Sequence, residues 1–434
     1  MKSNIIYQSI FAVALLSLAS CKPELKTVTP TQGNADFSRY IAVGNSLTSG
    51  FADGGLYLDG QKNSFPGMIA TQMKTVGGGE FYTPFFNDAQ ADGTGYKKLS
   101  SFTAAGDPVI TDVAAQAVRD VITIPDFGKV TLMTKYSGEI NNYGVPGIKL
   151  GQITYKPYGN LNGYFERLLP GNSPTNNTAY IDFVTEKPFT FFSLWLGNND
   201  ILGYATTGGA SPADQPTDKA TFTALYNLAA SRMTANGAKG VVATIPDVLS
   251  TPYFTTVTLA ALLKGVQASA PTVTSLYIKT GAGDVRPATA KDYFILPFSS
   301  AGLLGKPNGS GIPYGLHPLN PIESQYVLDE AEAAKVADYV TYYNQTIKSV
   351  AAAKQLAVVD TYAIFKEYAA GKMVNGAEVS AAYITGNIFS LDGIHLTPLG
   401  YAIVANEFIR SINKTYASGI PIVDVTKYRG VKFP

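Results

Sequence analysis

Three side chains in this sequence have the types that nucleophilic catalysis needs. Ser46 is a candidate nucleophile, provided that another part of the chain supplies a base. Asp392 and His395 are three residues apart, so both side chains can lie on the same side of one turn of backbone. The carboxylate could then hold one imidazole nitrogen while the other nitrogen takes the proton of the serine. This combination predicts acyl transfer through a serine.

Amide and backbone N–H groups that could stabilise an oxyanion accompany these side chains. Asn199 offers a side-chain NH₂ group, and Gly147 and Ser46 offer backbone N–H groups. Because Gly147 has no Cβ, a substrate carbonyl can approach its backbone closely. We therefore predict an oxyanion hole formed by Ser46, Gly147 and Asn199.

Each of these residues also has a structural explanation. Gly, Asn and Ser are common turn residues, so the stretch around Ser46 could be an ordinary turn after a strand. His395 could cap or pack against the last helix, and Asn199 and Asp200 could cap the helix that follows them. We expect Asp200 to have that capping role even if Asn199 is catalytic. The only other histidine, His317, is expected in a surface loop.

Short apolar runs that end in turn residues predict the strands of a buried sheet. The run 41–43 is followed by Gly44, which places Ser46 just beyond the carboxyl end of a strand. Open α/β sheets bind their ligands at that end. Asp247, two residues after the end of another such run, is expected to be a turn or cap residue. The further strands are predicted over 189–196, 240–245 and 357–360.

Helical periodicity separates these runs. Ser64 and Pro66 mark the start of a helix with apolar residues at 65, 69 and 73. A helical pattern between about 150 and 169 is interrupted by Pro157 and Gly159. Alternating strands and helices predict a doubly wound α/β sheet. The longest amphipathic patterns cover 222–233, 336–350 and 401–412.

Two long segments rich in Gly, Pro or aromatic residues interrupt this alternation. The first covers about 80–140 and is expected to be irregular, with a helix near 113–121. The second covers 251–321. We interpret both as insertions into one domain, 38–416, which is followed by a C-terminal tail, 417–434.

The composition excludes several classes of function. Of 434 residues, 46% are hydrophobic and 15% are charged, which is typical of a globular protein. The formal net charge is +1, so no strong field favours nucleic acid, and we predict no nucleic-acid partner. With two histidines and one cysteine, a zinc site is not expected. Carboxylate-rich metal sites are harder to exclude, but we predict neither a metal nor a cofactor.

The N-terminus has the features of a targeting segment. A basic Lys2 precedes an apolar run, 10–18, that is too short to span a bilayer. Small residues lead to Cys21, so residues 1–21 resemble a bacterial lipoprotein signal in which Cys21 becomes lipidated; an ordinary signal peptide is the alternative. The polar segment 22–37 would be a tether. These features predict a protein of the bacterial cell envelope, anchored by lipid to the outer membrane and facing the periplasm or the exterior.

Four stretches together resemble the blocks of the SGNH (GDSL-type) hydrolases, in the order of that family. They are Gly44-Asn45-Ser46-Leu47, Asn142-Tyr143-Gly144-Val145-Pro146-Gly147, Gly197-Asn198-Asn199-Asp200 and Asp392-Gly393-Ile394-His395. The resemblance implies an α/β/α sandwich with a small parallel sheet, of the flavodoxin-like kind, and a serine esterase mechanism without metal.

Residue by residue, the resemblance makes Ser46 the nucleophile, His395 the general base and Asp392 its orienting acid. Gly147 and Asn199 become the oxyanion donors beside the Ser46 N–H. This sequence departs from the family at two points. Asn45 replaces the usual Asp of the first block, a position outside the chemical groups. Pro146 and the insertion before it make the second block less regular, so Gly144 remains an alternative to Gly147.

These observations predict a lipid-anchored esterase or lipase that forms an acyl-enzyme on Ser46. Its substrate could be an acetylated glycan, a short acyl ester or a phospholipid. A non-catalytic, ligand-binding surface lipoprotein with the same fold is the alternative. A phosphate-binding α/β protein is disfavoured, because no Gly-rich loop is followed by Lys and Ser or Thr. The two insertions are expected to form the walls of the pocket.

Overall fold

A computed structural model describes residues 29–434 of the chain. The predicted signal sequence 1–21, the predicted lipidation site Cys21 and the first part of the predicted tether, 22–28, lie outside the described residues. Within 29–434, no helix is both long enough and apolar enough to cross a membrane.

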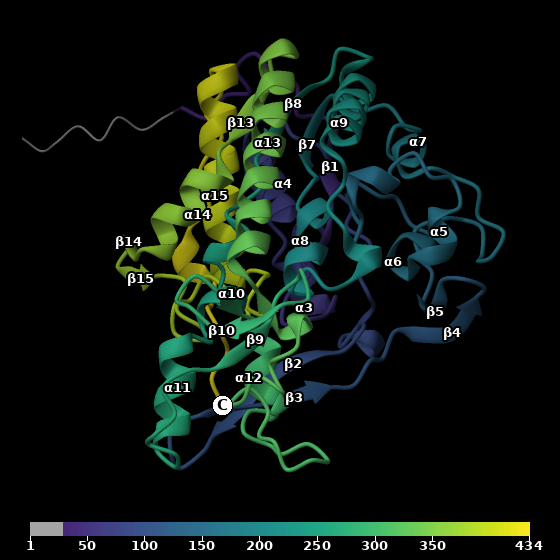
Figure 1. Ribbon diagram of the computed structural model, residues 1–434. Helices are drawn as coiled ribbons and strands as arrows, with labels where there is room; N and C mark the ends of the chain where they lie inside the picture. Colours follow the sequence, from purple (N-terminus) through teal and green to yellow (C-terminus); the bar gives the residue numbers. More distant parts are fainter. Residues whose placement is uncertain (1–28) are drawn as a thin grey trace, which may run out of the picture.

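The fold is built on a five-stranded, wholly parallel sheet with the strand order β13-β8-β7-β1-β6 (Figure 1). This arrangement confirms the predicted α/β class. Four strands match the predicted apolar runs, and the fifth, β6, was missed because its three residues form no apolar run. The bounds are Tyr40–Gly44 for β1, Asn142–Gly144 for β6, Phe191–Trp195 for β7, Lys239–Ala243 for β8 and Ala357–Val359 for β13.

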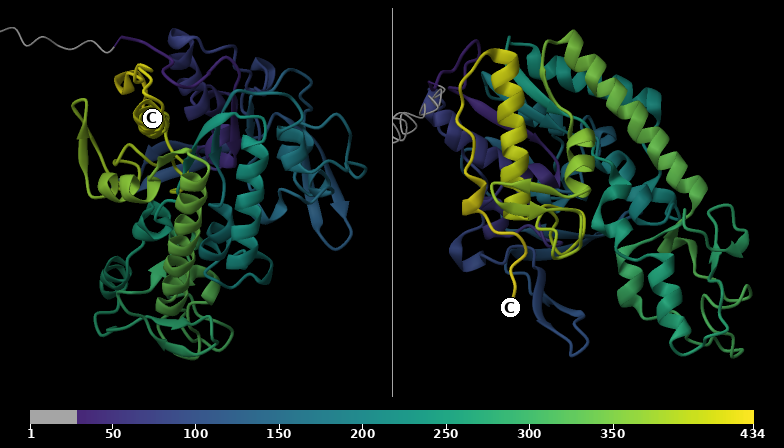
Figure 2. Two further views of the ribbon diagram at one scale, coloured as in Figure 1. Left: turned by 90° about the horizontal axis from the view of Figure 1, so that it is seen from above. Right: turned by 90° about the vertical axis from the view of Figure 1, so that its left-hand side faces the viewer.

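Helices cover both faces of the sheet, which is why its strands are apolar on both sides. In the right-hand view of Figure 2, the yellow helix α15 and the green helix α13 lie on opposite sides of the sheet. The helices of the main domain are α2 (Ser46–Ser49), α3 (Leu58–Lys62), α4 (Phe65–Met73), α5 (Tyr158–Leu161), α6 (Gly163–Glu166), α7 (Tyr180–Val184), α8 (Asn199–Thr206), α9 (Lys219–Thr234), α13 (Glu330–Ala353), α14 (Thr361–Ala369) and α15 (Pro398–Tyr416).

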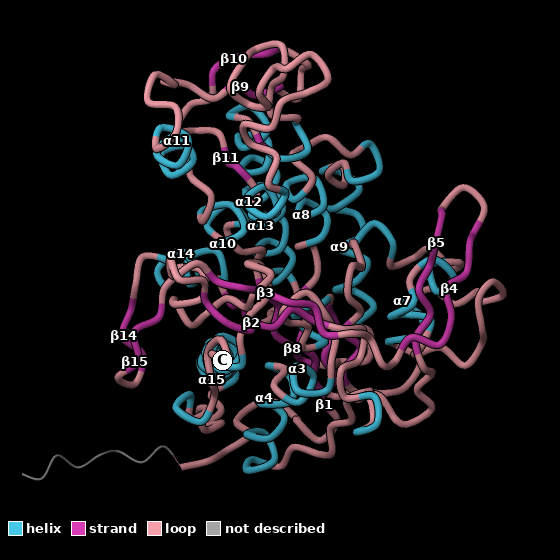
Figure 3. Tube along the Cα trace, turned by 90° about the horizontal axis from the view of Figure 1, so that it is seen from below, coloured by secondary structure: helices cyan, strands magenta, loops and turns pink. Residues whose placement is uncertain are grey.

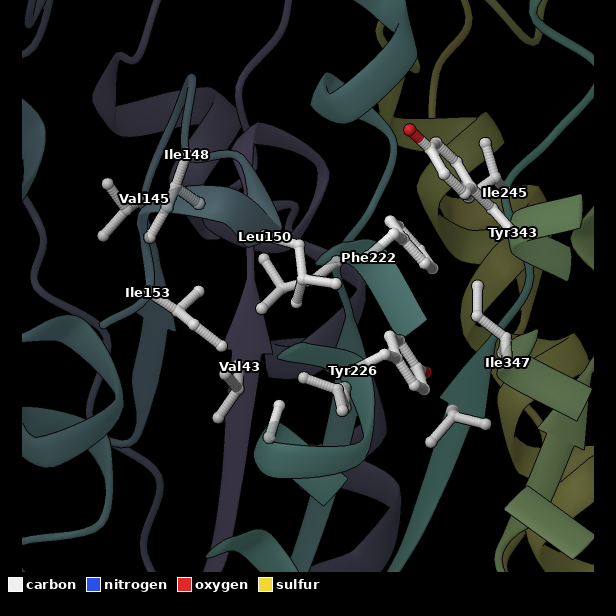
Figure 4. Packing of buried hydrophobic residues seen from close by; sticks show 14 of the residues in the cluster. Val43, Val145, Ile148, Leu150, Ile153, Phe222, Tyr226, Ile245, Tyr343 and Ile347 are labelled. Carbon is white, nitrogen blue, oxygen red and sulfur yellow. The ribbon is translucent and has the colours of Figure 1, made fainter. Parts of the chain in front are cut away.

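Alternate residues of one strand enter two separate hydrophobic cores. Phe192 of β7 belongs to the core under α9 and α13, whereas Phe191 and Trp195 belong to the core under α4 and α15. In the first core, Phe222 stacks on Tyr343 with ring centroids 3.8 Å apart (Figure 4). The two cores pack against opposite faces of the same sheet, so both faces of its strands are buried.

The first insertion, about 80–140, contains no α-helix. It forms two antiparallel hairpins, and the residues predicted as a helix, 113–121, lie at the end of one strand and the start of another. The β-branched residues of Val118-Arg-Asp-Val-Ile-Thr-Ile favour a strand, and they outweighed the weak helical pattern. The strands are β2 (Tyr96–Phe102), β3 (Pro108–Val113), β4 (Val118–Ile124) and β5 (Gly128–Met133).

The second insertion has a hydrophobic core of its own, formed by Val257, Leu276, Ile278, Phe294, Phe298, Ile322 and Val327. Both insertions lie at the carboxyl end of the sheet, in the lower half of Figure 1, and Figure 3 looks onto this end from below. The elements of the second insertion are α10 (Pro252–Thr255), α11 (Leu259–Gln267), α12 (Leu296–Ala301), β9 (Tyr277–Lys279), β10 (Val285–Pro287), β11 (Tyr293–Phe294) and β12 (Val327–Leu328), and a last hairpin, β14 (Lys372–Val374) with β15 (Ala377–Val379), follows α14.

The two ends of the described chain pack against the domain. Ala35 and Phe37, from the predicted tether, are buried in the core under α4 and α15. The packed domain therefore begins before Ser38, because an apolar side chain at 37 is more stable in this core than in water. The C-terminal tail also enters that core, through Ile420, Val423 and Val425.

Candidate active site

A sharp strand-to-helix turn presents Ser46. Strand β1 ends at Gly44, and the Asn45 side chain caps the next helix by accepting a hydrogen bond from the Leu47 N–H at 3.1 Å. A Cβ at Gly44 would overlap the Thr48 hydroxyl, so only glycine allows the helix to start this close to the strand. Ser46 is therefore fixed at the carboxyl end of β1, with 7% of its surface exposed.

The structure brings the three residues predicted for nucleophilic catalysis into direct contact. The Nε2 atom of His395 lies 2.8 Å from Oγ of Ser46, and its Nδ1 atom lies 2.7 Å from Oδ2 of Asp392. His395 precedes α15, whose N-terminus is capped by Thr397 and not by His395. The ring therefore bridges the serine and the carboxylate instead of capping the helix.

Four hydrogen-bond donors from the backbone and a nearby side chain hold the Asp392 carboxylate in addition to the imidazole. Oδ1 accepts from the N–H groups of Ile394 and His395, at 2.9 and 2.8 Å, and from the Ser390 hydroxyl at 3.2 Å. Oδ2 accepts from the Gly54 N–H at 2.9 Å. Burial alone would raise the pKa of Asp392, but the His395 ring and these backbone donors together hold this pKa well below its usual range.

The loop that carries Asp392 is clamped from two sides. On one side, Asp53 accepts a hydrogen bond from the Leu391 N–H at 2.9 Å, and its own backbone carbonyl accepts from Lys97 in β2. On the other side, the Tyr253 N–H of α10 donates to the Gly393 carbonyl at 3.0 Å. The second insertion therefore supplies one half of the clamp directly, and the first insertion supports the other half through the bond from the Lys97 N–H to Asp53. Sequence reasoning missed Asp53 and Tyr253, since no local motif marks them.

The surroundings of Asn199 agree with a role as an oxyanion donor. Its Nδ2 atom donates one hydrogen bond to the Ile148 carbonyl, at 2.9 Å, and the second N–H of the amide is not used in this contact. Ile148 directly follows Gly147, so this bond ties the amide to the Gly147 turn. Within 29–434, the Gly147 N–H forms no hydrogen bond. The Gly144 N–H, by contrast, donates to Asn142 Oδ1 at 3.0 Å, which favours Gly147 over Gly144 as the donor.

Asp200 was expected to cap the helix α8, but its side chain instead binds the segment that follows Gly147. Its carboxylate accepts hydrogen bonds from the backbone N–H groups of Leu150 and Gly151 and from the Thr217 hydroxyl. Burial raises the pKa of Asp200 to about 6, and these three donors oppose that rise only in part. The side chain thus joins the start of α8 to the segment after Gly147.

A pocket that is open to solvent, with about 570 Å³ of empty space when the adjoining solvent is included, lies beside Ser46, Asn199 and His395. Asp247, expected as a turn residue, is part of its lining. His317 does not line it; His317 is exposed in a loop, where its Nδ1 accepts the Leu319 N–H. Among residues 29–434, no group of three or more His, Cys, Asp or Glu side chains is placed to hold a metal ion.

The sequence model of a family described as GDSL-like Lipase/Acylhydrolase matches residues 40–408. No curated protein matches the chain. Similar solved structures include LAE5, an alpha/beta hydrolase enzyme from the metagenome of Lake Arreo, Spain, with 10% identity and a TM-score of 0.38 over 87% of this chain and 96% of that one. Another is the lipase/acylhydrolase from Enterococcus faecalis, with 13% identity and a TM-score of 0.32 over 89% and 100%.

Proposed function

Because the chain belongs to the family of GDSL-like lipases and acylhydrolases, and is therefore an ester hydrolase, we propose that it cleaves a carboxylic ester through an acyl-enzyme on Ser46. The observation that carries this proposal is the continuous hydrogen-bonded chain from Ser46 through His395 to Asp392. A serine becomes a useful nucleophile only when such a base accepts its proton.

In the first half of the reaction, Oγ of Ser46 attacks the carbonyl carbon of the ester and its proton passes to Nε2 of His395. The negative charge that develops on the carbonyl oxygen is stabilised by N–H groups of Ser46, Gly147 and Asn199. The tetrahedral intermediate then expels the alcohol, which takes the proton from His395. Asp392 stays ionised throughout, because its pKa is held low, and it stabilises the imidazolium.

In the second half, a water molecule attacks the acyl-enzyme. His395 takes a proton from this water and returns it to Oγ of Ser46 as the acid leaves. The same oxyanion donors serve both halves of the reaction. The net change is one ester bond and one water molecule converted to an acid and an alcohol, with no cofactor needed.

Hydrolysis of p-nitrophenyl acetate by the full chain in detergent tests this proposal. We expect Ser46→Ala and His395→Ala each to lower kcat by at least about 1,000-fold. His317→Ala is the matched control, because it removes the only other histidine without touching the site, and its rate should equal that of the wild type. Equal rates for Ser46→Ala and wild type would overturn the assignment of the nucleophile.

A second test traps the intermediate. An alkyl fluorophosphonate should modify the chain once, and peptide mass spectrometry should place the adduct on Ser46. Modification of a different residue would contradict the proposed mechanism. A folded wild-type chain that neither reacts nor hydrolyses any ester would favour the ligand-binding alternative.

We also propose that the enzyme acts at the bacterial cell envelope, attached through a lipid on Cys21. The support is the sequence alone: a basic start, a short apolar run, and small residues before the single cysteine. One acyl chain gives only weak membrane attachment, whereas several chains on one residue give stable attachment. The proposed substrates, an acetylated glycan, a short acyl ester or a phospholipid, all fit that location.

A further inference from the structure

We infer that the pocket beside Ser46 binds the acyl chain of the substrate, and that this chain is aliphatic, uncharged and longer than acetyl. The inference rests on the proposed function, because it assigns a pocket to the acyl group that Ser46 would carry. It narrows the three proposed substrate classes to esters of aliphatic acids and disfavours acetylated glycans.

Apolar side chains form much of the lining of this pocket. Five of its lining residues are buried apolar ones, with exposed fractions of 0–6%: Ile245, Val248, Phe365, Phe389 and Leu396. They come from the segment after β8, from α14 and from the loop that carries the catalytic pair. A pocket whose walls are buried side chains removes an aliphatic ligand from water, and that burial favours binding by about 0.8 kcal/mol for each CH₂ group.

Phe365 and Phe389 form an aromatic pair within this apolar wall. Their ring centroids lie 5.9 Å apart, and both side chains also pack against the core under α4 and α15. They are thus held in place before any ligand binds. A preformed apolar wall limits how long and how wide a bound chain can be.

Two of the polar side chains in the lining, Ser250 and Thr251, already use their hydroxyl donors within the loop that carries them. The Ser250 hydroxyl donates to the Asp247 carbonyl at 2.7 Å, and the Thr251 hydroxyl donates to the Val248 carbonyl at 3.0 Å. Their donors are therefore already used within the loop. The negative charge of Asp247 opposes a chain that ends in a carboxylate. A neutral hydrocarbon chain fits the apolar part of this lining.

The position of the pocket favours the acyl group over the alcohol. Ser46 and His395 form part of the pocket wall, so a chain joined to Oγ of Ser46 can extend directly into the pocket. The alcohol must leave before water attacks, whereas the acyl chain stays on the enzyme through both halves of the reaction. Apolar contacts to the acyl chain can therefore stabilise both transition states.

The experiment measures hydrolysis of p-nitrophenyl acetate, butyrate, hexanoate and octanoate by the full chain in detergent. Each ester is kept below its own critical micelle concentration. We expect kcat/KM to rise from acetate by roughly four-fold for each added CH₂ until the pocket is filled. Phe389→Ala should shift the preferred chain to a longer one. Leu202→Trp, at a partly exposed lining position of α8, should lower the octanoate-to-acetate ratio of kcat/KM by at least about ten-fold.

Phe298→Ala is the matched control for Phe389→Ala. Phe298 is similarly buried, at 3% exposed, but it lies in the core of the second insertion and does not line the pocket. It should leave the chain-length profile as in the wild type, even if it lowers stability. A profile that shifts equally in both variants would overturn the role of Phe389.

Two results separate this inference from the proposed function. If the wild type hydrolyses acetate in a Ser46-dependent way but the profile is flat or falls with chain length, the acyl pocket is wrong and the mechanism stands. If activity on alkyl acetates rises with the length of the alcohol while the acyl series stays flat, the pocket binds the alcohol. If no ester is hydrolysed, the proposed function fails, and the acyl pocket with it.

Discussion

Hydrogen bonds fix the orientation of both oxygen atoms of the Asp392 carboxylate. Both of its oxygens are occupied by donors, and one of these donors is the Nδ1–H of His395. This arrangement leaves Nε2 of the ring as an acceptor, which is the form that can take the proton of Ser46. The tautomer of the His395 ring therefore depends on Asp392 presenting an acceptor oxygen to Nδ1.

Asp392→Asn tests that dependence. If its NH₂ group faces His395, Nδ1 must accept a hydrogen bond, and Nε2 then carries the proton and cannot act as a base. We expect kcat to fall by about 10,000-fold while KM changes little. Steady-state kinetics on p-nitrophenyl butyrate and circular dichroism would measure the effect and check the fold. Retention of more than a tenth of kcat would contradict the role of Asp392.

Asn199→Ala removes one proposed oxyanion donor. We expect kcat to fall by about 100- to 1,000-fold with a nearly unchanged KM, since the amide acts mainly on the charge of the transition state. Asn227→Ala, on the exposed face of α9, is the control and should have no effect. A rise in KM at constant kcat would show that Asn199 binds the ground state instead.

Asp200 makes stability depend on pH. Its pKa in the folded protein, about 6, lies above the value near 3.9 of an unfolded chain. Its contribution to the free energy of unfolding is therefore fully present below pH 3.9 and is lost as the pH rises through 6. Asp200→Asn does not titrate. From pH 4 to pH 7, the free energy of unfolding of the wild type should fall by about 2 kcal/mol relative to that of this variant.

Urea unfolding at pH 4, 5.5 and 7 measures this difference. The exposed Asp88→Asn variant is the control. Parallel stability profiles for wild type and Asp200→Asn would show that the carboxyl group of Asp200 titrates in the folded protein as it does in the unfolded chain.

Among the secondary-structure elements, the sequence predicted best those with a long hydrophobic periodicity or a continuous apolar run. The long amphipathic helices α9, α13 and α15 and four apolar strands could be predicted, because burial dictates their periodicity. The edge strand β6 could not, since only its pairing with β1 makes it a strand. The hairpin β4–β5 was mistaken in part for a helix. Ser46, Asp392 and His395 were predicted from local motifs, whereas the clamp on the Asp392 loop depends on contacts between distant segments.

Gly393 is the point where the second insertion meets the catalytic loop. Its φ is +73°, and a Cβ there would lie 2.9 Å from the backbone nitrogen of Tyr253. Gly393→Ala should therefore displace the loop between Asp392 and His395 and lower kcat by about 100-fold. Gly371→Ala is a matched control, because its φ is also positive, +98°, but a Cβ there meets nothing within 4 Å. A similar loss of kcat in both variants would point to general strain and not to the clamp.

At the scale of the whole molecule, one sheet carries two cores and two insertions, and every part of the candidate site lies at one end of that sheet. The packed domain also includes residues near both ends of the described chain, since Phe37 and Val425 share a core. The proposed lipid on Cys21 would therefore be separated from the packed domain by a short segment only.

Cys21→Ser tests the proposed anchor. After expression in a bacterium that processes lipoproteins, the wild type should sediment with the membranes and incorporate labelled palmitate. The variant should incorporate none. Its esterase activity per folded molecule should equal that of the wild type, because Cys21 precedes the predicted domain, 38–416. Incorporation of palmitate by the variant at the wild-type level would contradict the lipid anchor on Cys21.

Ser46 and His395 lie 349 residues apart, yet they share a hydrogen bond. The nucleophile is thus among the first parts of the domain to be synthesised and its base among the last. A ribosome that stalls, or a protease that cuts the growing chain before residue 395, releases a fragment with a serine that nothing activates. Only a chain that has been completed through residue 395 therefore contains the base that the proposed mechanism requires.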